Sequence, residues 1–247
     1  MQASISHNWL ATPIGNALIE HEQHIVEDVL DGVFGEQLLQ LGVWGDAGAF
    51  IRYSRTQRAC CLAEQKDASV GVIGSLHRLP VASESVDAVI LPHTLEFSSR
   101  PQAILREVDR VLRSDGHLVV MGFRPGGLWG VRRIVPGAGL PPDTRQLIPE
   151  RQLKDWLSLL DLKLLGAKSY VFRWPLPGNG GAVSMTWEAR GQRWWPELGA
   201  CYMLTAQKRM LTLTSVKKAA WRSRPKVVGG LVKPTTRISR IHVDENS

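Results

Sequence analysis

The sequence has few cysteines and no long apolar run. Only three of its 247 residues are cysteine, and no CxxC pair is present. Cys60 and Cys61 are adjacent and cannot form an ordinary disulfide, so a reducing cytoplasm is the simplest compartment. No stretch approaches the roughly 18 apolar residues of a membrane-spanning helix. The N-terminal MQASISHNW lacks a basic region followed by an apolar one, so we expect no secretory signal and a cytoplasmic protein.

Two patterns of nicotinamide-dependent reductases are also missing. No GxGxxG follows the first predicted strand, and neither Tyr170 nor Tyr202 has a lysine four residues later. These absences argue against a nicotinamide-dependent reductase. We predict no metal site.

The positive charge is concentrated at one end of the chain. The net charge is +7, and Lys208–Ser247 alone holds ten Lys/Arg and two Asp/Glu, a net charge of +8. The remaining residues therefore carry −1. Because the segment after Met210 has little apolar periodicity, we predict a domain over residues 1–209 and a basic, disordered tail over residues 210–247. The tail's charge favours nucleic acid or an anionic surface, and a solvated tail that aids solubility remains an equal alternative.

The stretch around which the chain is organised lies near its middle. Val86–Leu91 is a short apolar run, as in a strand buried on both faces. Pro101–Leu112 has one apolar stripe at helical spacing, and His117–Gly122 is a second apolar run after the turn signal Asp115-Gly116. Strand, helix and strand form a βαβ unit with parallel strands. In such a sheet, ligands bind beyond the carboxyl ends of the strands, here at Leu91–His93 and Gly122–Arg124.

Apolar runs and helical stripes continue on both sides of this unit, as expected for one doubly wound α/β domain. The N-terminal helix begins at Pro13, with Thr12 as its N-cap. The segment Gly48–Gln57 is a weak helix at best. The other predicted elements are strands at Glu36–Gly42, Arg58–Glu64, Ser69–Gly74, Leu162–Phe172 and Gly199–Gln207, and helices at Pro13–Val33, Leu128–Val135 and Pro149–Leu160.

The central motifs also carry a family resemblance. LPxxxxSVDxVxxxHxLE, followed by LREVxRVLxxDGxLVVxGFxP, resembles the middle of a class I S-adenosylmethionine-dependent methyltransferase of the type 11 group, and is most similar to an uncharacterised proteobacterial branch with an altered glycine motif. The resemblance covers roughly Pro13–Arg209. It implies a Rossmann-like sheet of seven strands with the last one antiparallel, and S-adenosylmethionine as the cofactor.

The turn after the first strand is the first candidate cofactor contact. The resemblance implies an acid and a glycine-rich turn here, because a backbone without side chains can approach the methionine part of the cofactor. The chain keeps Gly42 and Gly45, but has Val43 and Trp44 where small residues are expected and Gln40 where an acid often lies. We expect Gly42, Trp44 and Gly45 beside the methionine part. A plain turn between a strand and a helix is the alternative.

The second and third strands supply candidates for the nucleoside. Glu64 lies 19 residues after Gly45, where Rossmann-like sites hold a ribose hydroxyl pair. A solvated surface acid is the equal alternative for Glu64. By resemblance, Ser75 takes the place of an acid that binds the adenine amine, and the backbone N–H of Leu76 can serve adenine whatever its side chain.

The end of the fourth strand supplies the last candidates. Pro92 and His93 are expected beside the sulfonium. His93 is a candidate base because its ordinary pKa lies near neutrality, but a structural histidine that bonds to backbone is favoured, since many methyl transfers need only proximity and in-line geometry. Glu96 is placed to cap the next helix.

These observations predict an S-adenosylmethionine-dependent methyltransferase with an unknown acceptor, most simply a small molecule, and no assigned catalytic residue. The alternative is a non-catalytic methyltransferase-like protein with a binding or regulatory role, which the altered glycine turn favours. Trp174–Trp195 holds four of the nine tryptophans together with arginines, which can stack on bases or rings, although a packed flap is the favoured interpretation.

Removal of residues 212–247 should leave the thermal midpoint of unfolding nearly unchanged, because the tail has too few apolar residues to build a core. Differential scanning calorimetry of the truncated chain checks this. A drop of many degrees would show that Trp221 or Val227-Val228 docks on the domain.

If the tail binds nucleic acid, the affinity should fall steeply with salt and vanish on truncation.

Overall fold

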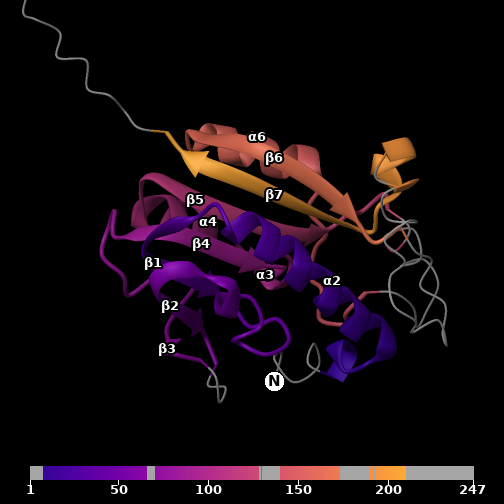
Figure 1. The fold of residues 1–247 in the computed structure, drawn as a ribbon, viewed down its shortest axis with the longest axis horizontal. Helices are drawn as coiled ribbons and strands as arrows, with labels where there is room; N and C mark the ends of the chain where they lie inside the picture. The colour runs from indigo at the N-terminus through magenta and orange to yellow at the C-terminus, as the bar shows by residue number, and fades with distance from the viewer. Residues whose placement is uncertain are drawn as a thin grey trace, which may run out of the picture. The chain divides into compact units, whose positions relative to one another are not determined.

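The computed structural model describes residues 8–65, 70–127, 129, 140–172, 190–191 and 193–209. They contain a seven-stranded sheet in the order β3-β2-β1-β4-β5-β7-β6 (Figure 1). The pairs β2–β3, β1–β2, β1–β4 and β4–β5 are parallel, and β7 is antiparallel to both β5 and β6. The predicted α/β class and the antiparallel last strand are therefore confirmed.

Each predicted strand overlaps an observed one, with bounds that shift by a few residues. The strands are β1 (Phe34–Leu41), β2 (Arg55–Ala63), β3 (Val72–Ile73), β4 (Val86–Pro92), β5 (Leu112–Phe123), β6 (Leu162–Tyr170) and β7 (Cys201–Lys208). The helices are α2 (Pro13–Leu30), α3 (Thr94–Phe97), α4 (Pro101–Val111) and α6 (Glu150–Leu159), with 3-10 turns η1 (Ile51–Tyr53) and η3 (Pro196–Leu198).

The central βαβ unit forms as predicted, with one difference at its turn. Strands β4 and β5 are paired in parallel, and the apolar stripe of α4 is buried. The predicted turn at Asp115-Gly116 lies inside β5, where Asp115 has φ +66° and the register shifts between the pairs Val86–Leu112 and Ala88–His117. The turn signal therefore marks an irregularity within one strand, and β5 continues on both sides of it.

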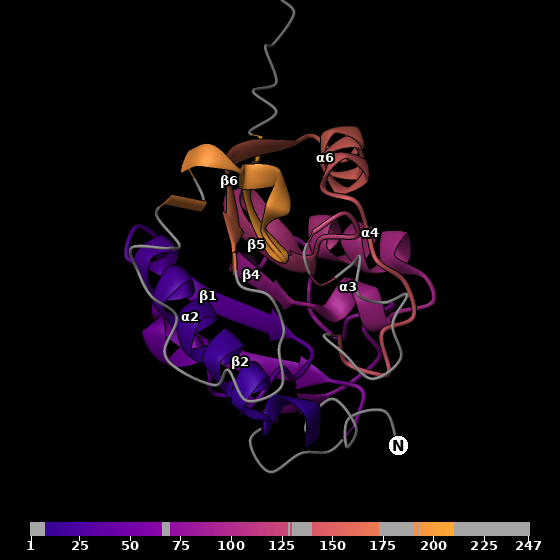
Figure 2. The ribbon, with the colours of Figure 1, turned by 90° about the vertical axis from the view of Figure 1, so that its right-hand side faces the viewer.

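Helices cover both faces of the sheet, as Figure 2 shows. Helices α4 and α6 pack on one face, and α2 packs on the other. Between β1 and β2 the chain forms only the short turn η1, so no helix from that connection covers the second face. The second face is covered instead by apolar side chains of α2, which pack against side chains from β1, β4 and β5: Leu18, Ile25, Val26 and Leu30 against Leu38, Ala88, Ile90, Val119 and Met121.

The start of α2 fixes the position of the helix on the sheet. Thr12 is the N-cap, and its Oγ1 accepts a hydrogen bond from the backbone N–H of Gly15 at 3.2 Å. Pro13 occupies the first helical position, as predicted. The helix ends at Leu30, earlier than the predicted Val33, because Asp31 and Gly32 follow as a turn.

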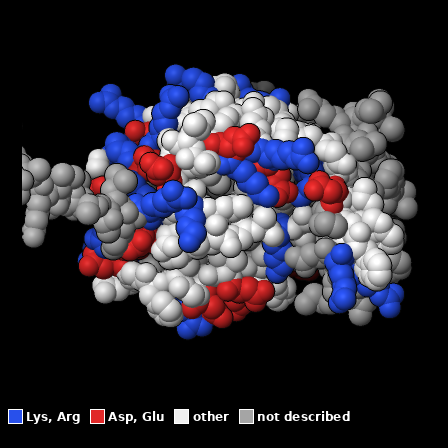
Figure 3. All heavy atoms as spheres, turned by 90° about the horizontal axis from the view of Figure 1, so that it is seen from above, with Lys and Arg blue, Asp and Glu red and all other residues white. Residues whose placement is uncertain are grey.

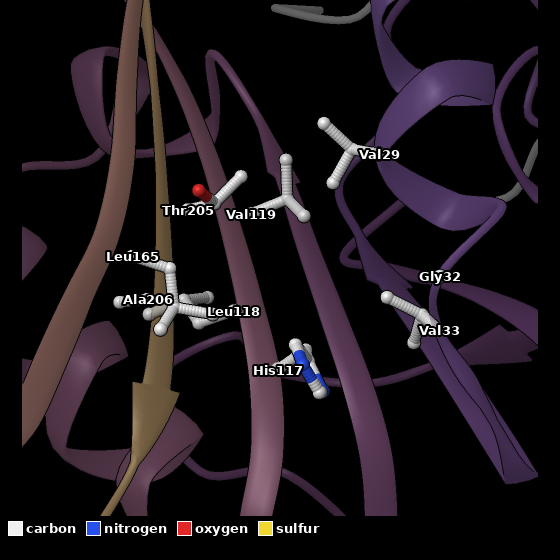
Figure 4. Close-up of a pocket in the computed structure, with 9 residues that line it drawn as sticks. All are labelled: Val29, Gly32, Val33, His117, Leu118, Val119, Leu165, Thr205 and Ala206. Atoms are coloured by element: carbon white, nitrogen blue, oxygen red, sulfur yellow. The ribbon is translucent and has the colours of Figure 1, made fainter.

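A mostly apolar pocket of about 240 Å³ opens between the end of α2 and strands β5, β6 and β7 (Figure 4). Figure 4 shows Val29, Val119 and Thr205 projecting toward the same space, with His117 at one end. The pocket lies beside the middle of β5 and the start of β1, away from the strand carboxyl ends. It is therefore separate from the edge at which the sequence predicts a cofactor.

Charges of both signs are interspersed on the surface. The face in Figure 3 shows Lys/Arg and Asp/Glu side chains next to one another. Ion pairs include Lys154 Nζ–Glu150 Oε1 at 2.6 Å and Lys208 Nζ–Asp109 Oδ1 at 3.3 Å. Within the described ranges, no helix is both long and apolar enough to cross a membrane.

Several predictions fall on residues that the structure does not describe. The predicted helix Leu128–Val135 lies outside the described residues except for Trp129, and so does most of the Trp-rich segment Trp174–Trp195. Residues 210–247 also lie outside them. The basic tail and the packed flap therefore stay predictions.

One carboxylate joins three neighbouring strands. Asp87 on β4 accepts hydrogen bonds through Oδ2 from the backbone N–H groups of Glu36 (2.7 Å) and Gln37 (2.8 Å) on β1. Its Oδ1 accepts one from Arg113 on β5 at 2.9 Å. Burial alone would raise the pKa of Asp87, but the hydrogen bonds from Gln37 and Glu36 and the charge of Arg113 outweigh burial and lower it.

The substitution Asp87→Asn should destabilise the fold by about 1–3 kcal/mol near neutral pH, the scale for hydrogen bonds to a charged group. Since the folded pKa is depressed, the stabilisation is present above the ordinary aspartate pKa of about 3.9 and is lost as pH falls through the folded value. Urea unfolding between pH 7 and pH 3 measures this. The exposed Asp155→Asn serves as the charge-matched control, and a difference that does not shrink at acid pH would contradict the assignment.

Candidate active site

A cluster of buried polar side chains joins α2 to the carboxyl ends of β1 and β4. Glu22 of α2 lies at its centre and is fully buried. Its Oε1 is 2.7 Å from His93 Nε2 and accepts a hydrogen bond from the Tyr170 hydroxyl at 2.8 Å. Its Oε2 accepts one from the indole N–H of Trp44 at 2.8 Å. Glu96 Oε2 is 3.0 Å from His93 Nδ1, so one imidazole lies between two carboxylates.

Two aromatic rings pack against this imidazole. The ring centroid of His93 is 4.4 Å from that of Trp44 and 4.1 Å from that of Phe123. Trp9 and Phe97 also pack on Trp44, with centroids 6.1 Å and 5.9 Å away. Side chains therefore fill the space between the ends of β4 and β5 next to His93.

The environment of His93 favours its protonated form. Burial alone would lower the pKa of His93, but the carboxylates of Glu22 and Glu96 outweigh burial and raise it to about 9. Both ring nitrogens face carboxylates, so neither is free to take a proton from a substrate. The geometry favours a structural role of His93 over a general base, although the ring bonds to two carboxylates and not to backbone as expected.

Glu96 does not cap α4, so that prediction is wrong. The N-cap of α4 is Arg100, with no side-chain hydrogen bond. Glu96 lies in α3, which begins just after His93 turns the chain with φ +54°. Its Oε1 accepts a hydrogen bond from the backbone N–H of Phe123 at 2.5 Å. Burial raises the pKa of Glu96, against the effect of His93.

The turn after β1 has the backbone conformation that glycine allows. Gly42 has φ +85° and Gly45 has φ +73°. A Cβ on Gly42 would lie 3.0 Å from Thr94 Oγ1, and one on Gly45 would lie 2.7 Å from Ile19 Cδ1. The positive φ favours glycine at both positions, and a Cβ at Gly42 would also crowd the side chain of Thr94. Trp44, between them, is 1% exposed and turned inward onto His93, so its indole fills space beside the turn at which the methionine part was expected.

Gln40 provides an unsatisfied acceptor beside this turn. Its Nε2 donates to the carbonyl of Gly42 at 3.0 Å, while its buried Oε1 has no hydrogen-bond partner within the described part of the chain. Buried polar atoms are normally paired, so an unpaired oxygen calls for an explanation. An oxygen at this strand end, where the resemblance expects an acid, fits a ligand that carries an ammonium group.

The structure brings the predicted nucleoside contacts together at the ends of β2 and β3. Glu64 Oε1 accepts a hydrogen bond from the backbone N–H of Leu76 at 3.2 Å and lies 3.6 Å from His77 Nδ1. The hydroxyl of Ser75 accepts one from the N–H of His77 at 3.3 Å. The Leu76 N–H that was expected to serve adenine is thus engaged by Glu64, and the carboxylate of Glu64 is half exposed.

Pro92 lies at the point where β1 and β4 are joined. It is buried, and its carbonyl accepts a long hydrogen bond from Thr94 Oγ1 at 3.4 Å. The same hydroxyl donates to the carbonyl of Leu41 at 2.5 Å. Thr94 therefore fixes the separation of the two strand ends beside which a ligand of this fold binds.

Glu22, which bonds to Trp44, His93 and Tyr170, was not predicted from the sequence. A signal for it was present in the spacing. Ile14, Leu18, Ile25 and Val29 form the apolar face of the predicted helix, and Glu22 falls on the same face, four residues after Leu18. An acid on an apolar stripe predicts a buried and paired carboxylate. Among the described residues, no group of three or more His, Cys, Asp or Glu side chains is placed to hold a metal ion.

Comparison with known proteins gives one family match and one relative. Residues 34–120, which span β1 to β5, match the model of a methyltransferase domain. The chain is 35% identical over 178 residues to the uncharacterised protein YafS of Escherichia coli K12, which covers 68% of this chain and 70% of that protein.

Solved structures with the same fold include two S-adenosylmethionine-dependent methyltransferases. The one from Thermotoga maritima has a TM-score of 0.58 at 18% identity, and the match covers 78% of this chain and 90% of that chain. The one from Archaeoglobus fulgidus has a TM-score of 0.57 at 13% identity, with 77% and 93% covered.

The substitution His93→Gln should destabilise the fold by about 3–5 kcal/mol near pH 6, because it leaves two buried carboxylates without their cation. A raised folded pKa means that the contribution of His93 is fully present below its ordinary pKa of about 6.5 and is lost as pH rises through about 9. The stability gap between the two proteins should therefore narrow between pH 6.5 and pH 9.5.

Denaturant titrations across this pH range measure the gap. His24→Gln, at an exposed histidine on the same helix as Glu22, is the matched control and should change little. A gap that stays constant with pH would show that His93 is neutral in the folded protein.

Proposed function

The chain belongs to the class I S-adenosylmethionine-dependent methyltransferases, and on this premise we propose that it transfers a methyl group from S-adenosylmethionine to an acceptor. The observation that carries the proposal is the topological switch point between β1 and β4. Strand order reverses there, and ligands of doubly wound sheets bind beyond the carboxyl ends at such a point. The left-handed glycines Gly42 and Gly45 lie at that edge. Family and fold do not favour a non-catalytic binding protein.

The nucleoside would be held at the ends of β2 and β3. Glu64 is the candidate for the ribose hydroxyls, because its half-exposed carboxylate can accept two hydrogen bonds. Ser75 and the N–H of Leu76 are the candidates for adenine, and a contact to Leu76 would displace Glu64 from that N–H toward the ribose.

The amino-acid part would lie against the turn after β1. The unpaired Oε1 of Gln40 can accept a hydrogen bond from its ammonium group, and the backbone of Gly42 and Gly45 allows close approach. Pro92 and His93 would lie beside the sulfonium, with the buried carboxylates of Glu22 and Glu96 behind them. The buried indole of Trp44 conflicts with this placement.

The bound cofactor supplies an electrophilic methyl group. The task of the chain is then to orient the acceptor in line with that methyl group and to exclude water, which the aromatic side chains Trp9, Trp44 and Phe123 can do. His93 holds a proton between two carboxylates and keeps the wall of the site in place. We propose a small molecule as the acceptor and the cytoplasm as the compartment.

Calorimetric titration with S-adenosylmethionine and S-adenosylhomocysteine tests the proposal. Both should bind, and Glu64→Gln should weaken binding by about 1–3 kcal/mol, the scale for a charged hydrogen-bond partner. Asp155→Asn on α6 removes the same charge at an exposed position and should have no effect. If a folded sample shows no heat and no thermal shift at millimolar ligand, the methyltransferase proposal is overturned.

A further inference from the structure

Trp44 belongs to the glycine turn after β1, and its side chain is part of the buried cluster around Glu22. The residues on either side of the indole, Gly42 and Gly45, keep the open backbone of a cofactor-binding turn. The indole itself is buried, lies 4.4 Å from the ring of His93 and donates a hydrogen bond to Glu22 at 2.8 Å. The Oε1 of Gln40, which precedes the same turn, has no hydrogen-bond partner among the described residues.

The residues that contact the indole lie outside the turn that carries it. Glu22 is held by three donors, Trp44, His93 and Tyr170, so it is fixed independently of any ligand. A buried carboxylate needs each of these partners, since an unpaired one is costly. The inward position of Trp44 is therefore stabilised by a charged group on α2, and rings of Phe97 and Phe123 add packing.

We propose that the indole of Trp44 is an internal occupant of the amino-acid half of the cofactor site, and that Glu22 holds it there. The inference rests on the proposed function. The amino-acid part of the ligand binds only when the indole has left Glu22, while the nucleoside half, at Glu64 and Leu76, is accessible in either state.

This arrangement sets which ligands the chain prefers. The apparent affinity of a ligand falls in proportion to the fraction of molecules that can accept it. The binding of ligands with an amino-acid tail, such as S-adenosylhomocysteine, is therefore weakened, whereas the binding of adenosine is not. Trp44 and Glu22 are thus determinants of cofactor affinity that reduce the usual preference for the amino-acid-bearing ligand.

The test compares two ligands on matched variants by calorimetry. Trp44→Gly, which restores the small residue of the turn, should bind S-adenosylhomocysteine on the order of tenfold to a hundredfold more tightly than the parent, given a hydrogen bond to a charged group that no longer has to break. Adenosine should bind both proteins equally. Trp44→Ala should show the same gain without the added backbone freedom of glycine, and its thermal midpoint and circular dichroism confirm folding.

Two further variants separate the occupant from general loosening. Trp44→Phe keeps a ring but loses the donor to Glu22, so its gain should be intermediate. Phe97→Ala removes packing from Trp44 but keeps the hydrogen bond of the indole to Glu22, so its gain in affinity should be much smaller than that of Trp44→Ala. An equal gain in Phe97→Ala would overturn the inference, because loosened packing would then suffice.

The remaining outcomes distinguish the inference from the proposed function. Equal binding of S-adenosylhomocysteine by the parent, Trp44→Gly and Trp44→Ala would overturn the role of Trp44 and leave the methyltransferase proposal intact. No binding of S-adenosylhomocysteine by any of the folded proteins would overturn both.

Discussion

The buried contact between Glu22 and His93 is the constraint on which the carboxyl edge of the sheet depends. Two carboxylates and an imidazole lie out of water within hydrogen-bond distance, and such groups are tolerated only when each is paired. The pairing draws on a helix before the sheet, on the ends of β4 and β5, and on β6 through Tyr170. A change in any of these elements leaves a buried charge without its partner.

The same contact explains the departure of this chain from the usual glycine turn. A small residue in place of Trp44 would leave Glu22 one donor short and would open the space beside His93. In the proposed site the turn therefore has two roles: its backbone would approach the ligand, and its indole completes the buried cluster. The backbone role is carried by Gly42 and Gly45, and the second role by the residue between them.

The elements of the fold were predictable because their signals are local. The apolar run of β4, the stripe of α4 and the Thr12-Pro13 start of α2 each depend on residues close in sequence, and the structure confirms them. The Asp115-Gly116 signal was misread as a turn because a left-handed residue also fits an irregular strand. Glu96 was assigned to the next helix because helix spacing cannot show that Phe123 presents a free N–H across the sheet.

The sequence by itself determined the α/β class and the parallel core of the sheet, since the hydrophobic period acts over a few residues. It also assigned Glu64, Ser75 and Leu76 to one candidate nucleoside site, and the structure brings these three residues together. Only the tertiary structure decided that Trp44 turns inward, that His93 is held between two carboxylates and that Glu22 joins them. The sequence separation between Glu22 and His93 is 71 residues, and a contact of that range follows from packing, which no local pattern encodes.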